Sequence, residues 1–253
     1  MENGNNPLVC FFDSGIGGLS LLCECVRRLP QVDFTYFADN FCVPYGNLCR
    51  KELIDKVDGI FGQINALAPA AAVVACNTVT AECIDFLREK YRFEIIGIQP
   101  ALKPALNAQG KNLVLATVAT AKSEAMKTLL EKFGGGRTEV VACGELAAAI
   151  ENNIDDLTAE KITGFLPKKK ADNVILGCTH YIFAKEIIKK FYNCRIFDGT
   201  EGTAERLCEK LGISDHFAVR RQKITFAGGD TVKNRAVFNK ILMTRGLHSQ
   251  NCD

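Results

Sequence analysis

Residues 71–80 read A-A-V-V-A-C-N-T-V-T, and residues 173–181 read N-V-I-L-G-C-T-H-Y. Each stretch is a short apolar run that ends in a small residue and is followed by a cysteine and small polar residues. Such a run predicts a buried strand of a parallel sheet. The cysteine then lies at the carboxyl end of the strand, where open α/β sheets bind their ligands. Because Cys76 and Cys178 lie about 100 residues apart, about one domain length, we expect each half of the chain to offer one thiol to a shared cleft.

Strands and helices alternate around these two stretches. The apolar runs predict strands at 8–12, 34–38, 71–75, 94–98, 112–116, 139–143, 174–176, 195–198 and 223–227. Helical patterns predict helices at 17–29, 50–67, 76–91, 100–107, 123–133, 203–211 and 232–242, with short helices on both sides of 152–157. This alternation predicts an α/β fold with mostly parallel sheets and helices on both faces.

The pattern restarts after the first four strands, which predicts two similar α/β domains facing each other across an active-site cleft. We expect residues 1–98 together with 206–253 to form the first domain, and residues 99–205 to form the second. The strand and helix that follow Gly199 are expected to complete the first sheet. The crossings between the domains are then short and lie near Ile98 and Gly199.

The composition excludes several classes of function. The formal net charge is +2, so no basic field attracts nucleic acid or an anionic membrane surface. No apolar run approaches the roughly 20 residues that span a bilayer, and M-E-N-G-N-N-P at residues 1–7 lacks the pattern of a signal peptide. We therefore expect a cytoplasmic protein without a nucleic-acid or membrane partner, and a loosely attached tail at 248–253.

Twelve cysteines are many for this length. A disulfide framework is not expected, because the chain is long, carries no secretory signal and has a large aliphatic core. A structural metal site is not expected either, because zinc needs paired ligands at close spacing and the three histidines stand apart, at 180, 216 and 248. Most thiols are expected to fill the core as small apolar side chains: Cys10, Cys23, Cys83, Cys143, Cys194 and Cys208.

Two glycine-containing loops follow the first two predicted strands. The first, D-S-G-I-G-G at 13–18, opens a helix and suits an anion, although a tight turn or a dinucleotide loop are alternatives. It matches neither G-x-G-x-x-G nor a Walker loop. A carboxylate beside an anion site is costly, so Asp13 is expected to accept or relay a proton. The second loop, A-D-N-F-C-V-P-Y-G-N at 38–47, is by itself more typical of a tight turn with a packed Tyr45.

The two cysteine loops offer acid–base groups. A cysteine before a helix N-terminus has a lowered thiol pKa, so we expect some thiolate at neutral pH. Asn77 and Thr78 supply neutral donors for a carboxylate. His180 follows Cys178 by two residues and is expected to orient or relay a proton, although a lone histidine is more often structural.

In this order and at this spacing, D-S-G-I-G-G, D-x-x-x-x-P-Y-G, A-C-N-T and G-C-T-H-Y resemble the motifs of the glutamate racemases, a branch of the aspartate/glutamate racemase superfamily. The resemblance runs from about Val9 to Asp230. It implies cofactor-independent racemisation of L- and D-glutamate, which supplies D-glutamate for peptidoglycan. It implies no metal, glutamate as the small-molecule partner, and it allows a homodimer.

The resemblance also implies roles for single residues. Cys76 resembles the thiol that works on D-glutamate and Cys178 the thiol that works on L-glutamate, with Asp13 and His180 as their respective acid–base partners. Asp39, and Glu151 in A-A-A-I-E-N, match two further carboxylates of the family site. The positions that match substrate contacts are Ser14, Pro44, Tyr45, Gly46, Asn77, Thr78, Thr120 and Thr179, with Thr120 in A-T-V-A-T.

The chain departs from the family pattern at three positions. Ala38 stands where glycine is common, Cys42 where arginine is common, and Gln99 where glutamate is frequent. None of these changes removes a catalytic atom. The arginine-to-cysteine change could alter how the second loop is anchored, or an interface.

Racemisation by this scheme removes the α-proton from one face and returns a proton to the other. No lysine stands in an obvious Schiff-base loop, so positioning, desolvation and hydrogen bonds to the developing dianion must lower the barrier. An aspartate racemase or a decarboxylase of the superfamily is an alternative, although a decarboxylase is expected to need one cysteine. A dithiol redox protein or a small-anion binding protein is a non-enzyme alternative, and a Cys76–Cys178 disulfide would need Cα atoms within about 7 Å.

Overall fold

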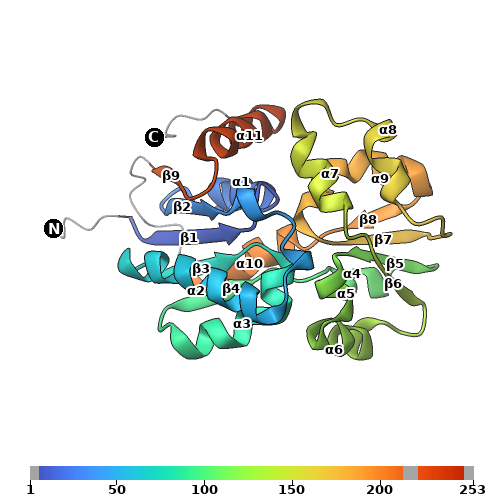
Figure 1. Ribbon diagram of the computed structural model, residues 1–253, viewed down its shortest axis with the longest axis horizontal. Helices are drawn as coiled ribbons and strands as arrows, with labels where there is room; N and C mark the ends of the chain where they lie inside the picture. Colours follow the sequence, from blue (N-terminus) through green and yellow to red (C-terminus); the bar gives the residue numbers. More distant parts are fainter. Residues whose placement is uncertain (1–5, 213–221, 248–253) are drawn as a thin grey trace.

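The computed structural model describes residues 6–212 and 222–247 and contains two sheets of parallel strands (Figure 1). The first sheet has the order β4-β3-β1-β2-β9 and the second the order β6-β5-β7-β8. The strands are β1 Leu8–Asp13, β2 Asp33–Ala38, β3 Ala71–Val74, β4 Glu94–Gly97, β5 Asn112–Ala116, β6 Thr138–Ala142, β7 Asn173–Gly177, β8 Arg195–Phe197 and β9 Ile224–Ala227. The predicted α/β fold with mostly parallel sheets is confirmed.

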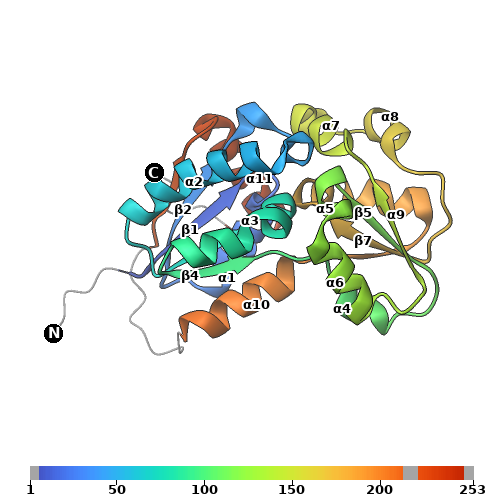
Figure 2. The ribbon, with the colours of Figure 1, turned by 60° about the horizontal axis from the view of Figure 1, so that its bottom comes forward.

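Helices cover both faces of each sheet (Figures 1 and 2). The helices are α1 Leu19–Arg28, α2 Arg50–Ala66, α3 Asn77–Lys90, α4 Leu102–Leu106, α5 Val118–Lys122, α6 Glu124–Phe133, α7 Leu146–Asn152, α8 Ala159–Ile162, α9 Lys185–Tyr192, α10 Thr200–Leu211 and α11 Thr231–Thr244. On the first sheet, α1, α10 and α11 pack on one face and α2 and α3 on the other. On the second sheet, α7, α8 and α9 cover one face, and α4 and α6 the other. Among the described residues, no helix is both long enough and apolar enough to cross a membrane.

The central strand β1 shows why the first sheet is a buried layer. Val9 and Phe11 point into the core under α1, α10 and α11, whereas Cys10 and Phe12 point into the core under α2 and α3. A strand that buries both faces needs a continuous apolar run, and this chain has one at this position. Five of the six cysteines predicted to fill the core are buried, while Cys208 is only partly buried.

The strand order reverses direction once in each sheet. In the first sheet the reversal lies between β1 and β3, and in the second between β5 and β7. Ligands of open α/β sheets bind at such points, beyond the carboxyl ends of the strands. The segments that leave β3 and β7 begin with the two cysteine loops, so both loops lie where the topology leaves room for a ligand.

The chain crosses between the sheets twice. The first crossing follows β4, and the second precedes α10, which packs on α1 of the first sheet. The predicted domain limit at 205/206 falls inside α10. A helix moves as one piece, so the second crossing lies before Thr200. The first sheet also contains β9, which pairs with β2. The domain division stays a prediction, and residues 213–221 and the predicted loose tail at 248–253 lie outside the described residues.

Two helices were not predicted. The first, α5, is only five residues long and follows β5 directly, and the second, α9, has the charged sequence K-E-I-I-K-K-F-Y. Only Ile188 of α9 is fully buried. At eight residues α9 is shorter than the window of about 11–18 residues over which a helical period is read from a sequence.

The aromatic core under α2 fixes the loop that follows β2, and Phe12 is at its centre. The Phe12 ring lies 6.0 Å from the Phe61 ring and 6.2 Å from the Tyr45 ring, and its side chain is fully buried. We expect Phe12→Ala to lower the free energy of unfolding by about 3–5 kcal/mol, because it leaves a cavity at this contact. Equilibrium urea unfolding followed by far-UV circular dichroism measures the change. Phe41 is 81% exposed, so Phe41→Ala is the control and should change stability by no more than about 0.5 kcal/mol. Equal effects from the two substitutions would contradict this account of the core.

Candidate active site

The loop that leaves β1 carries a buried carboxylate. Asp13 is fully buried, and its Oδ1 accepts a hydrogen bond from the backbone N–H of Gly15 at 2.8 Å. Its Oδ2 accepts one from the hydroxyl of Thr179 at 3.0 Å, and Thr179 belongs to the loop after β7 of the second sheet. Burial raises the pKa of Asp13 to about 6, although the charge of His180 and both hydrogen bonds lower it. A carboxyl group with this pKa can gain or lose a proton near neutral pH.

Gly15 lets this loop approach the second half of the chain closely. The phenol of Tyr36 donates a hydrogen bond to the Gly15 carbonyl at 2.8 Å, which fixes the loop on its own sheet. A Cβ atom at position 15 would lie 2.5 Å from Oε2 of Glu151 and 2.9 Å from Nε2 of His180. Glycine is therefore required here, because any side chain would push the Glu151–His180 pair away.

Cys76 follows β3 and is the N-cap residue of α3. It is 5% exposed, and its sulfur lies 3.7 Å from the hydroxyl of Ser14. Burial, together with the nearby charge of Asp13, raises the thiol pKa to about 12, although hydrogen bonds from Val79 N–H and Ser14 lower it. The expectation of a lowered pKa is therefore wrong for Cys76. Loss of hydration in the closed structure outweighs the helix N-terminus, so this thiol holds its proton at rest.

Cys178 follows β7 and faces the same cavity from the other sheet. It is 7% exposed and is the N-cap residue of the 3₁₀ helix η5, Thr179–Ala184. The sulfur lies 3.9 Å from Nδ1 of His180. Cys178 and Cys76 are both free thiols. This contact places His180 where it can exchange a proton with Cys178.

His180 and Glu151 form a buried charged pair. Nε2 of His180 lies 2.8 Å from Oε2 of Glu151, and the two side chains are 2% and 3% exposed. Burial alone would lower the pKa of His180, but hydrogen bonds to Cys178 and Glu151 raise it well above its usual value. Burial would raise the pKa of Glu151, but the His180 contact and hydrogen bonds from Ile16 and Asn40 lower it to about 2. Both shifts favour an imidazolium paired with a carboxylate.

Cys76, Cys178 and His180 line a small cavity between the two sheets, whereas Asp13 and Glu151 are not among its lining residues. The space in it that a water molecule could occupy is only about 10 Å³. Both thiols line it, one from each sheet. The other lining residues are Ser14, Val43, Pro44, Tyr45, Gly46, Asn77, Thr78, Thr117, Ala147 and Thr179.

Asp39 lies behind the cavity wall and does not line the cavity. Its Oδ2 accepts a hydrogen bond from the phenol of Tyr45 at 2.8 Å, and Tyr45 does line the cavity. Lys56 of α2 holds its ammonium 3.6 Å from Asp39 Oδ2 and 3.0 Å from the sulfur of Cys42. A cation thus lies beside Cys42, the position at which the sequence departs from an expected arginine. The sequence did not indicate Lys56, because it comes from another element.

Thr117 lines the cavity together with Thr78 and Thr179, whereas Thr120 does not, so a substrate contact of Thr120 stays a prediction. The hydroxyl of Thr117 lies 3.0 Å from that of Thr78 and donates a hydrogen bond to that of Thr120 at 2.9 Å. Thr120 therefore stands behind Thr117. The position of Thr117 in the sequence indicates that it lies at the cavity, because it comes after β5 in the same way as the two cysteines come after β3 and β7. Gly46 allows this arrangement, since a Cβ there would lie 2.6 Å from Cβ of Thr117.

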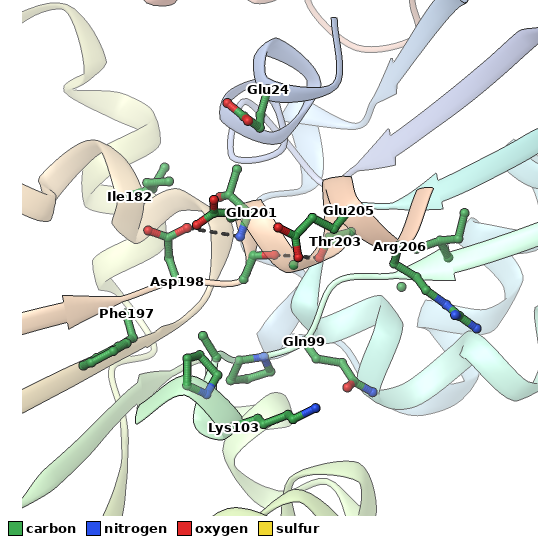
Figure 3. Close-up of a pocket in the computed structure, with 18 of the residues that line it drawn as sticks. Glu24, Gln99, Lys103, Ile182, Phe197, Asp198, Glu201, Thr203, Glu205 and Arg206 are labelled. Atoms are coloured by element: carbon green, nitrogen blue, oxygen red, sulfur yellow. Dashed lines mark hydrogen bonds between the residues drawn. The ribbon is translucent and has the colours of Figure 1, made fainter. Parts of the chain in front are cut away.

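A wider groove lies at the two crossings, away from the thiols (Figure 3). Gln99, Lys103, Asp198, Glu201 and Arg206 are among the residues that line it. The described residues of its lining include no cysteine or histidine. Across the described part of the chain, no group of three or more His, Cys, Asp and Glu side chains could hold a metal ion. The closed cavity between Cys76 and Cys178 is therefore the candidate site for proton transfer.

Comparisons with known proteins point to one family. Residues 23–207 match the family model described as Asp/Glu/Hydantoin racemase. The glutamate racemase of Clostridium novyi is 40% identical over 217 residues, which cover 79% of this chain and 82% of the relative. The glutamate racemase of Clostridium acetobutylicum is 38% identical over 236 residues, which cover 88% of this chain and 91% of the relative.

Solved structures agree with this result. Escherichia coli glutamate racemase in complex with L-glutamate and the activator UDP-MurNAc-Ala has a TM-score of 0.81 at 27% identity, and the match covers 98% of each chain. The isoform RacE1 of Bacillus anthracis glutamate racemase has a TM-score of 0.80 at 28% identity and covers 99% of this chain and 97% of that one.

The raised pKa of Asp13 makes stability depend on pH. The carboxyl titrates near about 3.9 in the unfolded chain and at about 6 in the folded one. The folded form thus binds the proton more tightly, so the stability that this proton confers is present below about pH 4 and is lost as the pH rises through about 6. Asp13→Asn carries no such penalty. Its free energy of unfolding relative to wild type should rise by roughly 1–3 kcal/mol between pH 4 and pH 7.5.

Urea unfolding at the two pH values tests this expectation. Asp155 is exposed and serves as the control. Asp155→Asn should show no more than about 0.5 kcal/mol of pH-dependent difference. A difference for Asp13→Asn that does not change with pH, or that falls as the pH rises, would show that burial does not govern this carboxyl.

Proposed function

The chain belongs to the Asp/Glu/hydantoin racemase family, and on this premise we propose that it interconverts L- and D-glutamate by two thiols that act on opposite faces of the α-carbon. It is an amino-acid racemase. The observation that carries the proposal is the closed cavity lined by Cys76 from one sheet and by Cys178 from the other. Inversion needs an acceptor for the α-proton on one face and a donor on the other, and one thiol from each side can meet that need.

In the proposed reaction the enzyme alternates between two forms that differ in which of the two thiols is protonated. The raised pKa of Cys76 favours the neutral thiol there, and we propose that Cys178, whose sulfur lies 3.9 Å from Nδ1 of His180, carries the thiolate. We propose that this form removes the α-proton of L-glutamate through Cys178, while Cys76 protonates the opposite face. When D-glutamate leaves, Cys178 carries the proton and Cys76 is the thiolate. Asp13 is then the proposed acid–base partner of Cys76. The buried Asp13, with a pKa of about 6, suits the exchange of that proton.

The cavity wall can stabilise the negative charge that develops on the substrate carboxylate. The N-terminus of α3, a 14-residue helix, begins at Asn77, and free N–H groups at a helix start attract an anion. Asn77 and Thr78 add side-chain donors to the cavity, whereas the hydroxyl of Thr179 donates to Asp13. Such donors act strongly in a site that excludes water, and each is typically worth about 10²–10³-fold in rate.

Asp39 and Glu151 take supporting roles in this proposal. Asp39 holds the phenol of Tyr45, and Glu151 holds the imidazole of His180, each through a hydrogen bond of 2.8 Å. Tyr45 and His180 line the cavity, whereas the two carboxylates stand behind them. We propose that both carboxylates position neighbouring side chains and do not touch the reacting atoms. Thr120 supports Thr117 in the same manner.

We propose glutamate and not aspartate as the substrate, because the relatives that match most of this chain are named glutamate racemases. We propose that the protein supplies D-glutamate for peptidoglycan in the cytoplasm. We also propose that it assembles as a homodimer. Against a dithiol redox protein stands the lining of the cavity, whose hydrogen-bond donors suit a carboxylate.

Circular dichroism of glutamate solutions tests the proposal. Pure protein without added pyridoxal phosphate should bring the optical signal of either enantiomer to zero, and a chelator should not prevent it. Cys76→Ala and Cys178→Ala should each lower turnover by at least about 10³-fold in both directions, because each removes the group on one face. Cys23→Ala is the matched control, since Cys23 is buried in the core outside the cavity, and it should retain turnover. Full activity in either cavity variant, or activity on aspartate alone, would contradict the proposal.

A further inference from the structure

The carboxylate of Glu151 joins the two halves of the molecule. Its Oε2 accepts hydrogen bonds from Nε2 of His180 at 2.8 Å and from the backbone N–H of Ile16 at 3.0 Å. Its Oε1 accepts hydrogen bonds from Nδ2 of Asn40 at 2.9 Å and from Nζ of Lys233 at 3.0 Å. His180 belongs to the same half of the chain as Glu151. Ile16 follows β1, Asn40 follows β2, and Lys233 lies in α11, which packs on the first sheet. Three of the four donors therefore come from across the gap.

Lys233 lies in the first turn of α11, whose end lies beside α7 (Figure 1). Its ammonium also donates to the backbone carbonyl of Glu151 at 2.9 Å. The contact therefore fixes both the main chain and the side chain of one residue. The Lys233 side chain is 29% exposed and that of Glu151 3% exposed, so solvent screens this ion pair less than a surface pair.

Hydrogen bonds tie Asn40 to the start of α11. The side-chain amides of Asn40 and Asn234 bond each other reciprocally, each at 3.0 Å, and Asn234 is fully buried. The backbone N–H of Asp230 donates to Oδ1 of Asn40 at 3.1 Å, and Asp230 caps α11 by accepting from the N–H of Lys233 at 2.9 Å. The loop after β2 and the start of α11 thus present Asn40 and Lys233 to Glu151 together.

The cavity can take up a ligand only if this junction opens. Its two thiols are 5% and 7% exposed, and His180 is 2% exposed. A substrate must therefore enter after the two sheets have moved apart. Because Ile16, Asn40 and Lys233 contact Glu151 from the opposite side, such a movement separates them from it.

We propose that Lys233 and Asn40 form a latch on Glu151 that holds the cleft closed and, through Glu151, holds His180 against Cys178. Lys233 is a positioning residue in this scheme, because it contacts neither the cavity nor a thiol. The inference rests on the proposed function only for the identity of the substrate. The latch itself is a property of the closed molecule.

Two consequences separate a latch from a contact that only stabilises the fold. Weakening the latch favours the open form, so substrate binding must supply more of the free energy of closure, and KM rises. The equilibrium constant of racemisation belongs to the enantiomers, so kcat/KM falls equally in both directions. The amide of Ile16 is the second reporter, because it loses its Glu151 partner whenever the cleft opens and then exchanges with solvent.

Lys233→Met removes the charge and the donor, and Lys240→Met on the exposed side of the same helix is the matched control. We expect Lys233→Met to lower kcat/KM by about 10- to 100-fold, mainly through KM. Hydrogen exchange followed by mass spectrometry should show the peptide that contains Ile16 exchanging about 10-fold faster or more. Lys240→Met should stay within about 2-fold of wild type in both measurements. Lys233→Arg, which keeps the cation, should restore most of both losses, and Lys233→Gln gives a milder second variant.

The exchange measurement needs no turnover, so it judges the latch even if the protein does not racemise glutamate. Unchanged exchange at Ile16 in Lys233→Met and Lys233→Gln would overturn the proposal while leaving the proposed reaction intact. Faster exchange with an unchanged KM would overturn it as well. A lower melting temperature with normal kinetics and normal exchange at Ile16 would reduce Lys233 to a structural contact and reject the latch.

Discussion

The exclusion of water from the space between Cys76 and Cys178 is the constraint on which the rest of the site depends. The two thiols are buried to 5% and 7% exposure between sheets that come from different halves of the chain. A dry environment strengthens every charge interaction inside it and penalises every unpaired charge. The raised pKa of Cys76 and the pairing of His180 with Glu151 are both results of this burial. The proposed chemistry needs the same property, because hydrogen bonds to the developing charge act more strongly where water is absent.

The topology explains how a chain can bury reactive groups in this way. Each sheet reverses its strand order once, and each reversal leaves a crevice at the carboxyl ends of the strands. The two crevices face each other, so loops from both sheets close one cavity. Small residues permit the closure, since Gly15 and Gly46 lie where a Cβ atom would collide with the opposite half. Polar contacts that cross the gap, such as Thr179 with Asp13, then link the two halves.

The sequence predicted the parts of the structure that depend on local pattern. Buried strands gave strong apolar runs, and the strand at 112–116 was predicted at the limits it has in the structure. The helices α5 and α9 were not predicted, because each is shorter than the window of about 11–18 residues over which a helical period is read. In the site, the positions of Cys76, Cys178 and Asp13 followed from strand ends. Only the folded structure shows that Thr117, and not Thr120, lines the cavity. The contact of Lys56 with Asp39 is likewise visible only in the fold. The predicted direction of the shift in the Cys76 pKa was wrong, because a sequence shows where a helix begins but not how much hydration a thiol loses.

Racemisation in D₂O, followed by proton NMR at low conversion, tests the two-thiol account most directly. If one thiol removes the α-hydrogen and the other, in exchange with solvent, supplies its replacement, the first product formed must carry deuterium at the α-carbon. The remaining substrate must still carry protium at that stage, whichever enantiomer is supplied. Product that keeps the hydrogen of its own substrate would show that a single base carries the proton from one face to the other. That result would contradict the account.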